Sequence, residues 1–123
     1  MGASVPALMR KKKCTAHRIM MSGAATESCE NGQFGRVRDQ GWWGVREWLR
    51  TDKLAMLPPD DELREELLAM HYFKDRTGRI KVTPKDIIKE KLNRSPDRCD
   101  SLMLTFCPTP PEEGGELYVT TYI

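Results

Sequence analysis

The chain has 123 residues, of which 39% are hydrophobic and 31% are charged, and its net charge at pH 7 is +2. This length suits one small domain, and the low hydrophobic share indicates a core that does not extend along the whole chain. The near-neutral balance does not by itself indicate a nucleic-acid partner, and no apolar run approaches the ~18 residues of a membrane span.

Residues 1–33 are predicted to be a loosely ordered basic leader. Five basic residues and no acid lie between Met1 and Thr26. The RKKK run that begins at Arg10 could contact phosphates. A solvated basic arm is the favoured interpretation, because no aromatic residue alternates with the charges.

The first predicted helix is Asp39–Arg50. Its residues at helical spacing are Trp42, Val45, Arg46 and Leu49, with Trp43 and Trp48 beside them. The three tryptophans could form a platform for stacking bases, but the helical spacing favours burial in a core.

A second helix is predicted after the break at Pro58 and Pro59. Asp60 or Asp61 caps it, because acids are favoured at a helix N-terminus. Its apolar stripe consists of Leu63, Leu67 and Met70. The acidic run could suggest a metal site, but a solvated helix face explains it equally well; the run consists of Asp60, Asp61, Glu62, Glu65 and Glu66.

The segment Tyr72–Val82 is predicted to be a β-hairpin. Apolar and basic residues alternate in RIKV, and the preceding D-R-T-G forms a turn in which Gly78 takes a positive φ. Because a lone hairpin is marginally stable in water, we expect a larger sheet or a helix to cover it.

Two further helices are predicted, each after a hydroxyl residue followed by proline. Thr83 caps the first, with Pro84 at the first helical position and Asp86 completing a capping box. Ser95 and Pro96 repeat the signal before the last helix. The packing residues are Ile87, Ile88 and Leu92 in the first helix, and Cys99, Leu102, Met103 and Phe106 in the second.

Two aspartates, Asp97 and Asp100, open the last helix. At about 100° per residue, Asp97 falls opposite the apolar stripe and Asp100 falls on its flank, where a carboxylate can lean into a cleft. From position alone, both are interpreted as ordinary acids of a first helical turn. The four cysteines and two histidines add no metal-ligand spacing, and reduced thiols in a cytosolic protein are the favoured interpretation.

An ordered series of segments resembles the C-terminal end of the nuclease domain of phage terminase large subunits. The segments are WWGVREWL, LPPDDELREEL, GRIKV and TPKDIIKEKLNRSPDRCDSLMLTF, within residues 34–107. In that family a Trp-rich helix, a Pro-Asp helix start, a G-R-I-K strand and an S-P-D-x-x-D-A-L-x-L-T-F terminus occur in this order. The resemblance implies an α+β chain, mainly helices plus one β-hairpin, that is a fragment of an RNase H-like α/β nuclease domain.

The resemblance also implies a site. The family packages viral DNA with an ATPase joined to a metal-dependent endonuclease that cuts concatemeric DNA. Asp100 matches the final acid of the motif, which implies a catalytic, metal-ligating role with Mg²⁺ or Mn²⁺. Asp97 matches the S-P-D acid and is interpreted as a helix-start residue. Cys99 and Ser101 replace alanines of the family pattern, and neither change removes a ligand.

Other parts of the family pattern are missing. The chain has no G-x-x-x-x-G-K-[ST] phosphate loop, and no segment resembles the strands that carry the first two catalytic acids, whereas two-metal hydrolysis needs several carboxylates. We therefore expect a truncated, prophage-like piece, inactive alone, in the bacterial cytoplasm. Residues 108–123 are expected to be a Pro/Gly-rich tail ending in strand-forming residues.

The partners implied by the resemblance are double-stranded DNA and phage packaging components, without a membrane or a small-molecule cofactor. Two alternatives stay open: a small non-enzymatic protein that binds DNA or protein, and a prophage remnant without a present role.

Overall fold

The computed structural model describes residues 8–9, 11–13 and 16–108. The chain divides into two units, one of residues 1–20 with 108–123, and one of Met21–Cys107. In the first unit the described residues include a short helical turn at Leu8 and Met9. None of the helices in the described part of the chain is long and apolar enough to cross a membrane. The predicted strand-forming end of the tail lies outside the described residues.

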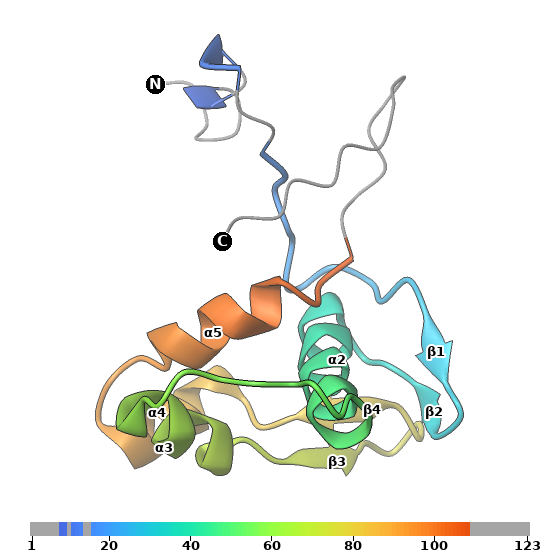
Figure 1. Ribbon diagram of the computed structural model, residues 1–123. Coiled ribbons are helices and arrows are strands. Elements are labelled where there is room, and N and C mark those ends of the chain that lie inside the picture. Colours follow the sequence, from blue (N-terminus) through green and yellow to red (C-terminus); the bar gives the residue numbers. More distant parts are fainter. Residues whose placement is uncertain (1–7, 10, 14–15, 109–123) are drawn as a thin grey trace. The chain divides into compact units, whose positions relative to one another are not determined.

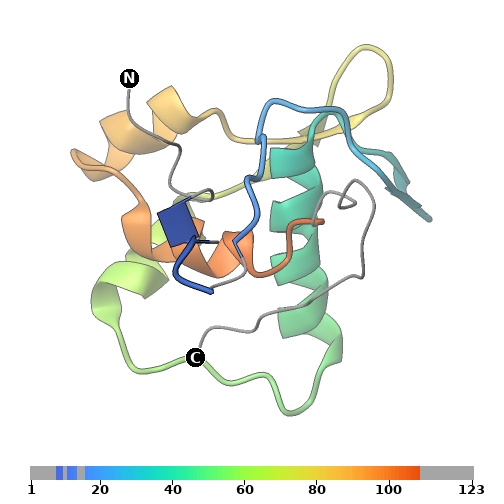
Figure 2. The same cartoon turned by 90° about the horizontal axis from the view of Figure 1, so that it is seen from above.

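The unit Met21–Cys107, called the compact unit below, is a mixed α+β structure. Its elements are β1 (Ser28–Cys29), β2 (Gly32–Gln33), α2 (Val37–Thr51), α3 (Asp61–Ala69), β3 (Tyr72–Lys74), β4 (Ile80–Val82), α4 (Lys85–Leu92) and α5 (Asp97–Leu104). From α2 onward the order helix, helix, hairpin, helix, helix is the predicted one. Helices α3, α4 and α5 lie on one side of α2, and β1 and β2 lie on the other (Figures 1 and 2).

The predicted hairpin is present as β3 and β4. The strands pair antiparallel, with Tyr72 opposite Val82, and Gly78 in the turn has φ +81°. The side chain of Asp75 holds this turn by accepting the backbone N–H groups of Thr77 and Arg79 at 2.9 and 3.0 Å. The hairpin does not stand alone, because β4 lies against the N-terminal half of α2.

A second hairpin, β1 with β2, was not predicted. It is only two residues long on each side, with Ser28 opposite Gln33, and so carries no alternating pattern that could reveal it. Phe34 directly follows it and forms an isolated parallel bridge with Ile80. The compact unit therefore includes residues 21–33, which the sequence assigned to the leader.

Backbone and side-chain bonds tie residues 21–33 to the start of α2. The N–H of Val37 donates to Gly23 O at 3.0 Å, and that of Arg38 donates to Met21 O at 3.2 Å. The side-chain amide oxygen of Gln40 accepts the Thr26 N–H at 2.9 Å. These bonds explain why a segment without hydrophobic periodicity is part of the compact unit.

The tryptophans are buried as predicted. Trp42 and Trp43 are 4% and 5% exposed, and the ring of Trp43 meets the edge of Tyr72 at 5.0 Å between centroids. Trp48 is half-buried against Phe106, with centroids 5.5 Å apart. The indoles are thus packing groups rather than an open stacking platform.

Two glycines allow α2 and α5 to approach closely. A Cβ at Gly41 would lie 2.7 Å from Cys107 Sγ and 2.9 Å from Met103 Sδ, and one at Gly44 would lie 2.9 Å from the Cβ of Phe106. In the G-W-W-G sequence, the two glycines therefore leave room for α5 and the residues after it, and the two tryptophans between them pack in the core.

Some sequence-based details were wrong. Thr83 does not cap α4: its hydroxyl accepts the His71 N–H at 3.0 Å and donates to His71 O at 3.1 Å, which ties it to the residue before β3. Ser95 does not cap α5, which has no side-chain cap from its N-cap residue. Leu49 and Ile87 are exposed rather than packed, because α2 and α4 each contact neighbours over a narrower stripe than predicted.

Candidate functional site

Asp100 stands in the first turn of α5, beside the start of α4. Its N–H donates to Pro96 O at 3.0 Å, and this hydrogen bond closes the first turn of the helix. Its Oδ2 lies 2.9 Å from Lys85 Nζ, and its side chain is 20% exposed. Lys85 is the first residue of α4 and closely follows β4. The carboxylate thus lies at the border between core and solvent, as the helical spacing of the sequence predicted.

Basic groups surround this carboxylate. Arg38 on α2 donates from Nη2 to Thr83 O at 2.9 Å. Burial lowers the pKa of Arg38, and the nearby carboxylates of Asp39 and Asp100 oppose that shift. Asp100 therefore has cationic neighbours from two helices, Arg38 on α2 and Lys85 on α4.

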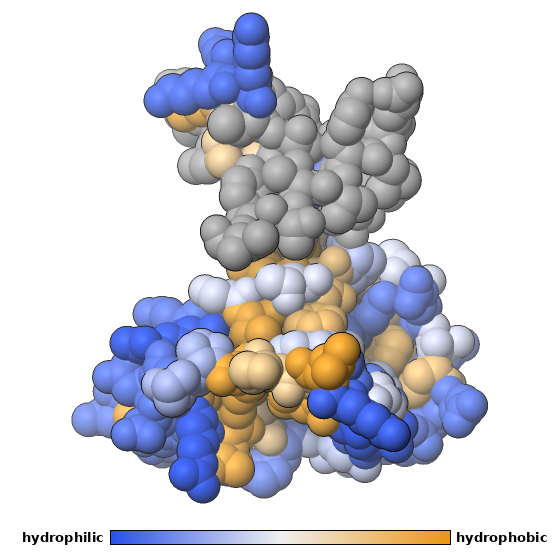
Figure 3. Space-filling view, viewed as in Figure 1, coloured by the Kyte–Doolittle hydropathy of each residue, from blue (hydrophilic) through white to orange (hydrophobic). Residues whose placement is uncertain are grey.

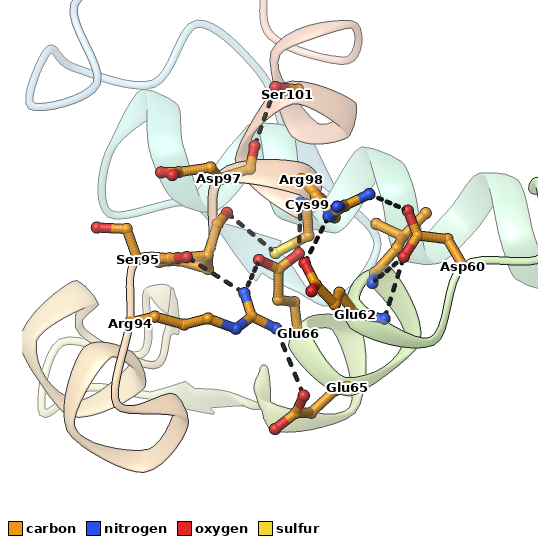
Figure 4. A network of polar contacts seen from close by, with 12 residues as sticks. Asp60, Glu62, Glu65, Glu66, Arg94, Ser95, Asp97, Arg98, Cys99 and Ser101 are labelled. Atoms are coloured by element: carbon orange, nitrogen blue, oxygen red, sulfur yellow. Dashed lines mark hydrogen bonds and ion pairs between the residues drawn. The ribbon is translucent and has the colours of Figure 1, made fainter.

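Asp97 has a different setting. Its side chain is exposed, and its backbone carbonyl accepts the hydroxyl of Ser101 at 2.9 Å. In Figure 4 its carboxylate points away from the polar network around α3 and α5. It is an acid of the first helical turn, where the helix dipole favours it.

The acid that supports the start of α5 is Glu66, from α3. It is 0% exposed, and its Oε2 accepts the Cys99 N–H at 3.1 Å. Its Oε1 accepts from Arg94 Nη1 at 2.6 Å, and this bond is the largest cause of the raised pKa of Arg94. Figure 4 shows Glu66 between Arg94 and the first turn of α5. It supplies the cap expected from Ser95.

A second set of ion pairs joins the same two helices at the surface. Arg98 on α5 reaches Asp60 and Glu62 at the start of α3. Of the two predicted caps, Asp60 and Asp61, it is Asp60 that accepts the N–H groups of Glu62 and Leu63, at 3.0 and 3.2 Å. The Leu63 bond is the largest cause of the lowered pKa of Asp60. Acids of this run therefore bind α5 and the loop before it. The sequence predicted a solvated face for the whole run, but Glu66 is buried.

Asp39 is also committed to structure. It is buried, its Oδ1 accepts the Val82 N–H at 2.9 Å, and its Oδ2 accepts the Arg36 N–H at 2.8 Å. One carboxylate thus caps α2 and covers the outer edge of β4. Asp39 and Glu66 are unavailable for chemistry, whereas Asp100 is partly open.

The described residues do not assemble a metal site around Asp100. Within residues 8–9, 11–13 and 16–108, no group of three or more His, Cys, Asp or Glu side chains could hold a metal ion. Mg²⁺ and Mn²⁺ need several oxygen ligands, and Asp100 is paired with a lysine instead of a second carboxylate. The residues present therefore do not fit a metal ion by themselves.

Sequence reasoning missed the partners of Asp100. Arg38 and Lys85 are far from Asp100 in sequence, and although Lys85 lies in the TPKDIIKEKL segment, no feature of the sequence pointed to either as a partner. Glu66 could have been found, because it lies three positions after Leu63 and so shares its side of the helix. Its partner Arg94 had no signal, because the loop before α5 has no periodicity.

Comparisons with known proteins add no relative. No family model matches the chain, and neither a curated protein nor a solved structure matches it.

Proposed function

We propose that the compact unit is a C-terminal part of the nuclease domain of a phage terminase large subunit. In this proposal it adopts part of an RNase H-like fold and acts in the bacterial cytoplasm on double-stranded viral DNA. It contributes one carboxylate, Asp100, to a cleavage site whose other acids come from another polypeptide. The chain alone does not cleave DNA.

The observation that carries this proposal is the setting of Asp100. Asp39 and Glu66 have their oxygens occupied by structural bonds, whereas Asp100 is partly exposed and held by a flexible lysine. A carboxylate that a surface lysine can release is suited to accept a different partner. The order of elements from α2 to α5 supports the same family, because it follows the series of motifs.

The cationic neighbours of Asp100 also suit a DNA substrate. Lys85 is half-exposed, and Arg38 lies close enough for Asp100 to raise its pKa. Positive groups beside a catalytic carboxylate can hold the phosphates of the strand to be cut. We therefore expect duplex DNA to approach this end of α4 and α5.

Complementation tests the proposal. The full chain is mixed with, or fused to, a polypeptide that carries the first strands and first two acids of a terminase nuclease domain. Cleavage of duplex DNA with Mn²⁺ is followed on gels, and we expect cutting only when both parts are present. Asp100→Asn should reduce cutting to background while circular dichroism stays unchanged.

Asp97→Asn is the matched control, because it changes the neighbouring acid of the same helical turn. It should leave cutting intact and cost at most about 1 kcal/mol of helix-start stability. Cutting that survives Asp100→Asn but is lost with Asp97→Asn would assign the role to the other aspartate. Robust cleavage by the chain alone would refute its dependence on another polypeptide.

A further inference from the structure

A wide groove of the compact unit lies away from Asp100. It is a groove of about 620 Å³ between α2 and the segment that joins α3 to β3. Its apolar lining comes mainly from Trp42, Trp43, Val45, Leu49, Leu67, Met70, Tyr72 and Val82. This groove is large enough for one or two apolar side chains, and the proposed nuclease site makes no use of it.

A free strand edge borders the groove. In the β3–β4 ladder, Thr83 N–H donates to His71 O and Asp75 N–H donates to Arg79 O. The alternation of an antiparallel pair then turns the N–H and C=O groups of Tyr72 and Lys74 outward. No strand pairs with this edge within the described residues.

The side chains of the edge are open as well. Tyr72 and Phe73 are 51% and 47% exposed, and all three residues of β3 are exposed. Apolar residues also gather across the middle of the compact unit in Figure 3, with hydrophilic residues on either side. Open apolar surface beside unpaired strand edges is typical of sites that accept an added strand.

The charges around the groove are positive. Among the described residues, its lining includes Arg46 and Arg50 and no Asp or Glu. The guanidinium of Arg46 lies over the rings of Trp43 and Tyr72, 4.5 and 5.4 Å from their centroids. Both arginines pair with Glu47, and Glu30 also acts on Arg50 electrostatically. Lys74 at the end of β3 and Arg76 and Arg79 in the turn add three cations, against one acid, Asp75.

From this edge, groove and charge we propose that β3 binds an extended segment of a partner protein that carries both apolar and acidic side chains. The segment pairs with the outward groups of Tyr72 and Lys74. Its side chains that face α2 are apolar where they enter the groove and acidic where they meet Arg46, Arg50 and Lys74. Arg46 and Arg50 lie on α2 itself, and Lys74 shares the face of Tyr72, which packs against Trp43 of α2.

The test uses the full chain labelled with ¹⁵N and a pool of decapeptides that each combine acidic and apolar residues. We expect the pool to shift the amide signals of Tyr72 and Lys74 and to slow their hydrogen exchange. A second pool, with lysine in place of each acid, should bind at least ~10-fold more weakly, equivalent to about 1.4 kcal/mol. Failure of the acidic pool to shift these amides at millimolar concentration overturns the proposal.

Three variants locate the contact. Lys74→Pro removes an outward N–H without a partner in the ladder, and should weaken binding of the acidic pool at least ~10-fold. Leu49→Glu, at an exposed position of the lining, should do the same by adding negative charge. Arg64→Gln, on the exposed face of α3 and outside the lining, is the control and should change nothing.

Other occupants give different results. Equal binding of both peptide pools would reduce the site to a non-specific apolar patch. Concentration-dependent dimerisation in sedimentation, abolished by Lys74→Pro, would assign the edge to a second copy of this chain. Shifts of Tyr72 and Lys74 by duplex DNA, with none from the acidic pool, would assign it to nucleic acid. Each outcome contradicts the peptide proposal and leaves the Asp100 experiment unaffected.

Discussion

At the scale of single residues, the carboxylates of the compact unit separate into structural and available groups. Asp39 accepts two backbone N–H groups from different segments, and Glu66 accepts a backbone N–H and a guanidinium N–H. Removing either leaves a buried donor unpaired, which is expensive. Asp100 has a partly exposed lysine as its ion-pair partner, so its loss costs the fold little and can be tested for function.

The cysteines provide a prediction at this scale. Burial raises the pKa of Cys99 to about 12, with smaller contributions from Glu66 and Asp100, and burial raises that of Cys107 to about 11. Since the thiolate is the reactive form, iodoacetamide at pH 8 should label the half-buried Cys29 and spare Cys99 and Cys107. Peptide mapping by mass spectrometry measures the labelling.

Denaturant is the control for this labelling, because unfolding should make Cys99 and Cys107 as reactive as Cys29. Rapid labelling of Cys99 in the folded protein would contradict the packing of α5 against α2 and α3. The described thiols Cys29, Cys99 and Cys107 are free in the structure, so a disulfide does not complicate the result.

At the scale of elements, α5 is positioned by other segments rather than by its own start signal. Glu66 caps it from α3, Arg98 links it to the first turn of α3, and Gly41 and Gly44 admit it to the face of α2. A helix of eight residues is marginal by itself in water. These contacts therefore determine where Asp100 lies.

Glu66→Ala tests this dependence. It removes the partner of Arg94 and leaves the Cys99 N–H without an acceptor. We expect a loss of about 3 kcal/mol in the free energy of unfolding, at the lower end of the range for breaking a buried ion pair, because Arg94 is partly exposed. Urea titration followed by tryptophan fluorescence measures the loss.

Glu65→Ala is the matched control for Glu66. Glu65 is the preceding acid on α3, it is 61% exposed, and it lies 3.4 Å from the same arginine. Because exposed ion pairs contribute little, its removal should barely move the urea midpoint. Equal effects of the two substitutions would show that the buried cap does not hold α5.

At the scale of the whole molecule, the compact unit should fold without the remaining residues. A chain of residues 21–107 retains all of the helices and strands from β1 to α5, and should unfold at nearly the same urea concentration as the full chain. A chain of residues 34–107 loses the Val37–Gly23, Arg38–Met21 and Gln40–Thr26 bonds. It should therefore be less stable by about 1–3 kcal/mol.

Equal stability of these two chains would restore the boundary predicted at residue 34. A large loss on shortening to residues 21–107 would instead show that the compact unit depends on the rest of the chain. Thermal unfolding by circular dichroism gives an independent measurement of both comparisons.

Periodicity and turn chemistry in the sequence by themselves determined the order of elements from α2 to α5, a cap at Asp60 or Asp61, the turn at Gly78 and the burial of Trp42 and Trp43. These features depend on neighbours within a few positions, where helical spacing and backbone preferences act directly. The flank position of Asp100 follows from the same arithmetic.

Tertiary structure alone decided which segments cap and cover one another. Glu66 rather than Ser95 caps α5, the Thr83 hydroxyl bonds to His71 instead of capping α4, residues 21–33 belong to the compact unit, and Lys85 pairs with Asp100. Each of these contacts joins residues distant in the chain, or replaces a local bond by a distant one. Local patterns carry no information about such choices, because a buried polar group accepts whichever partner packing brings within reach.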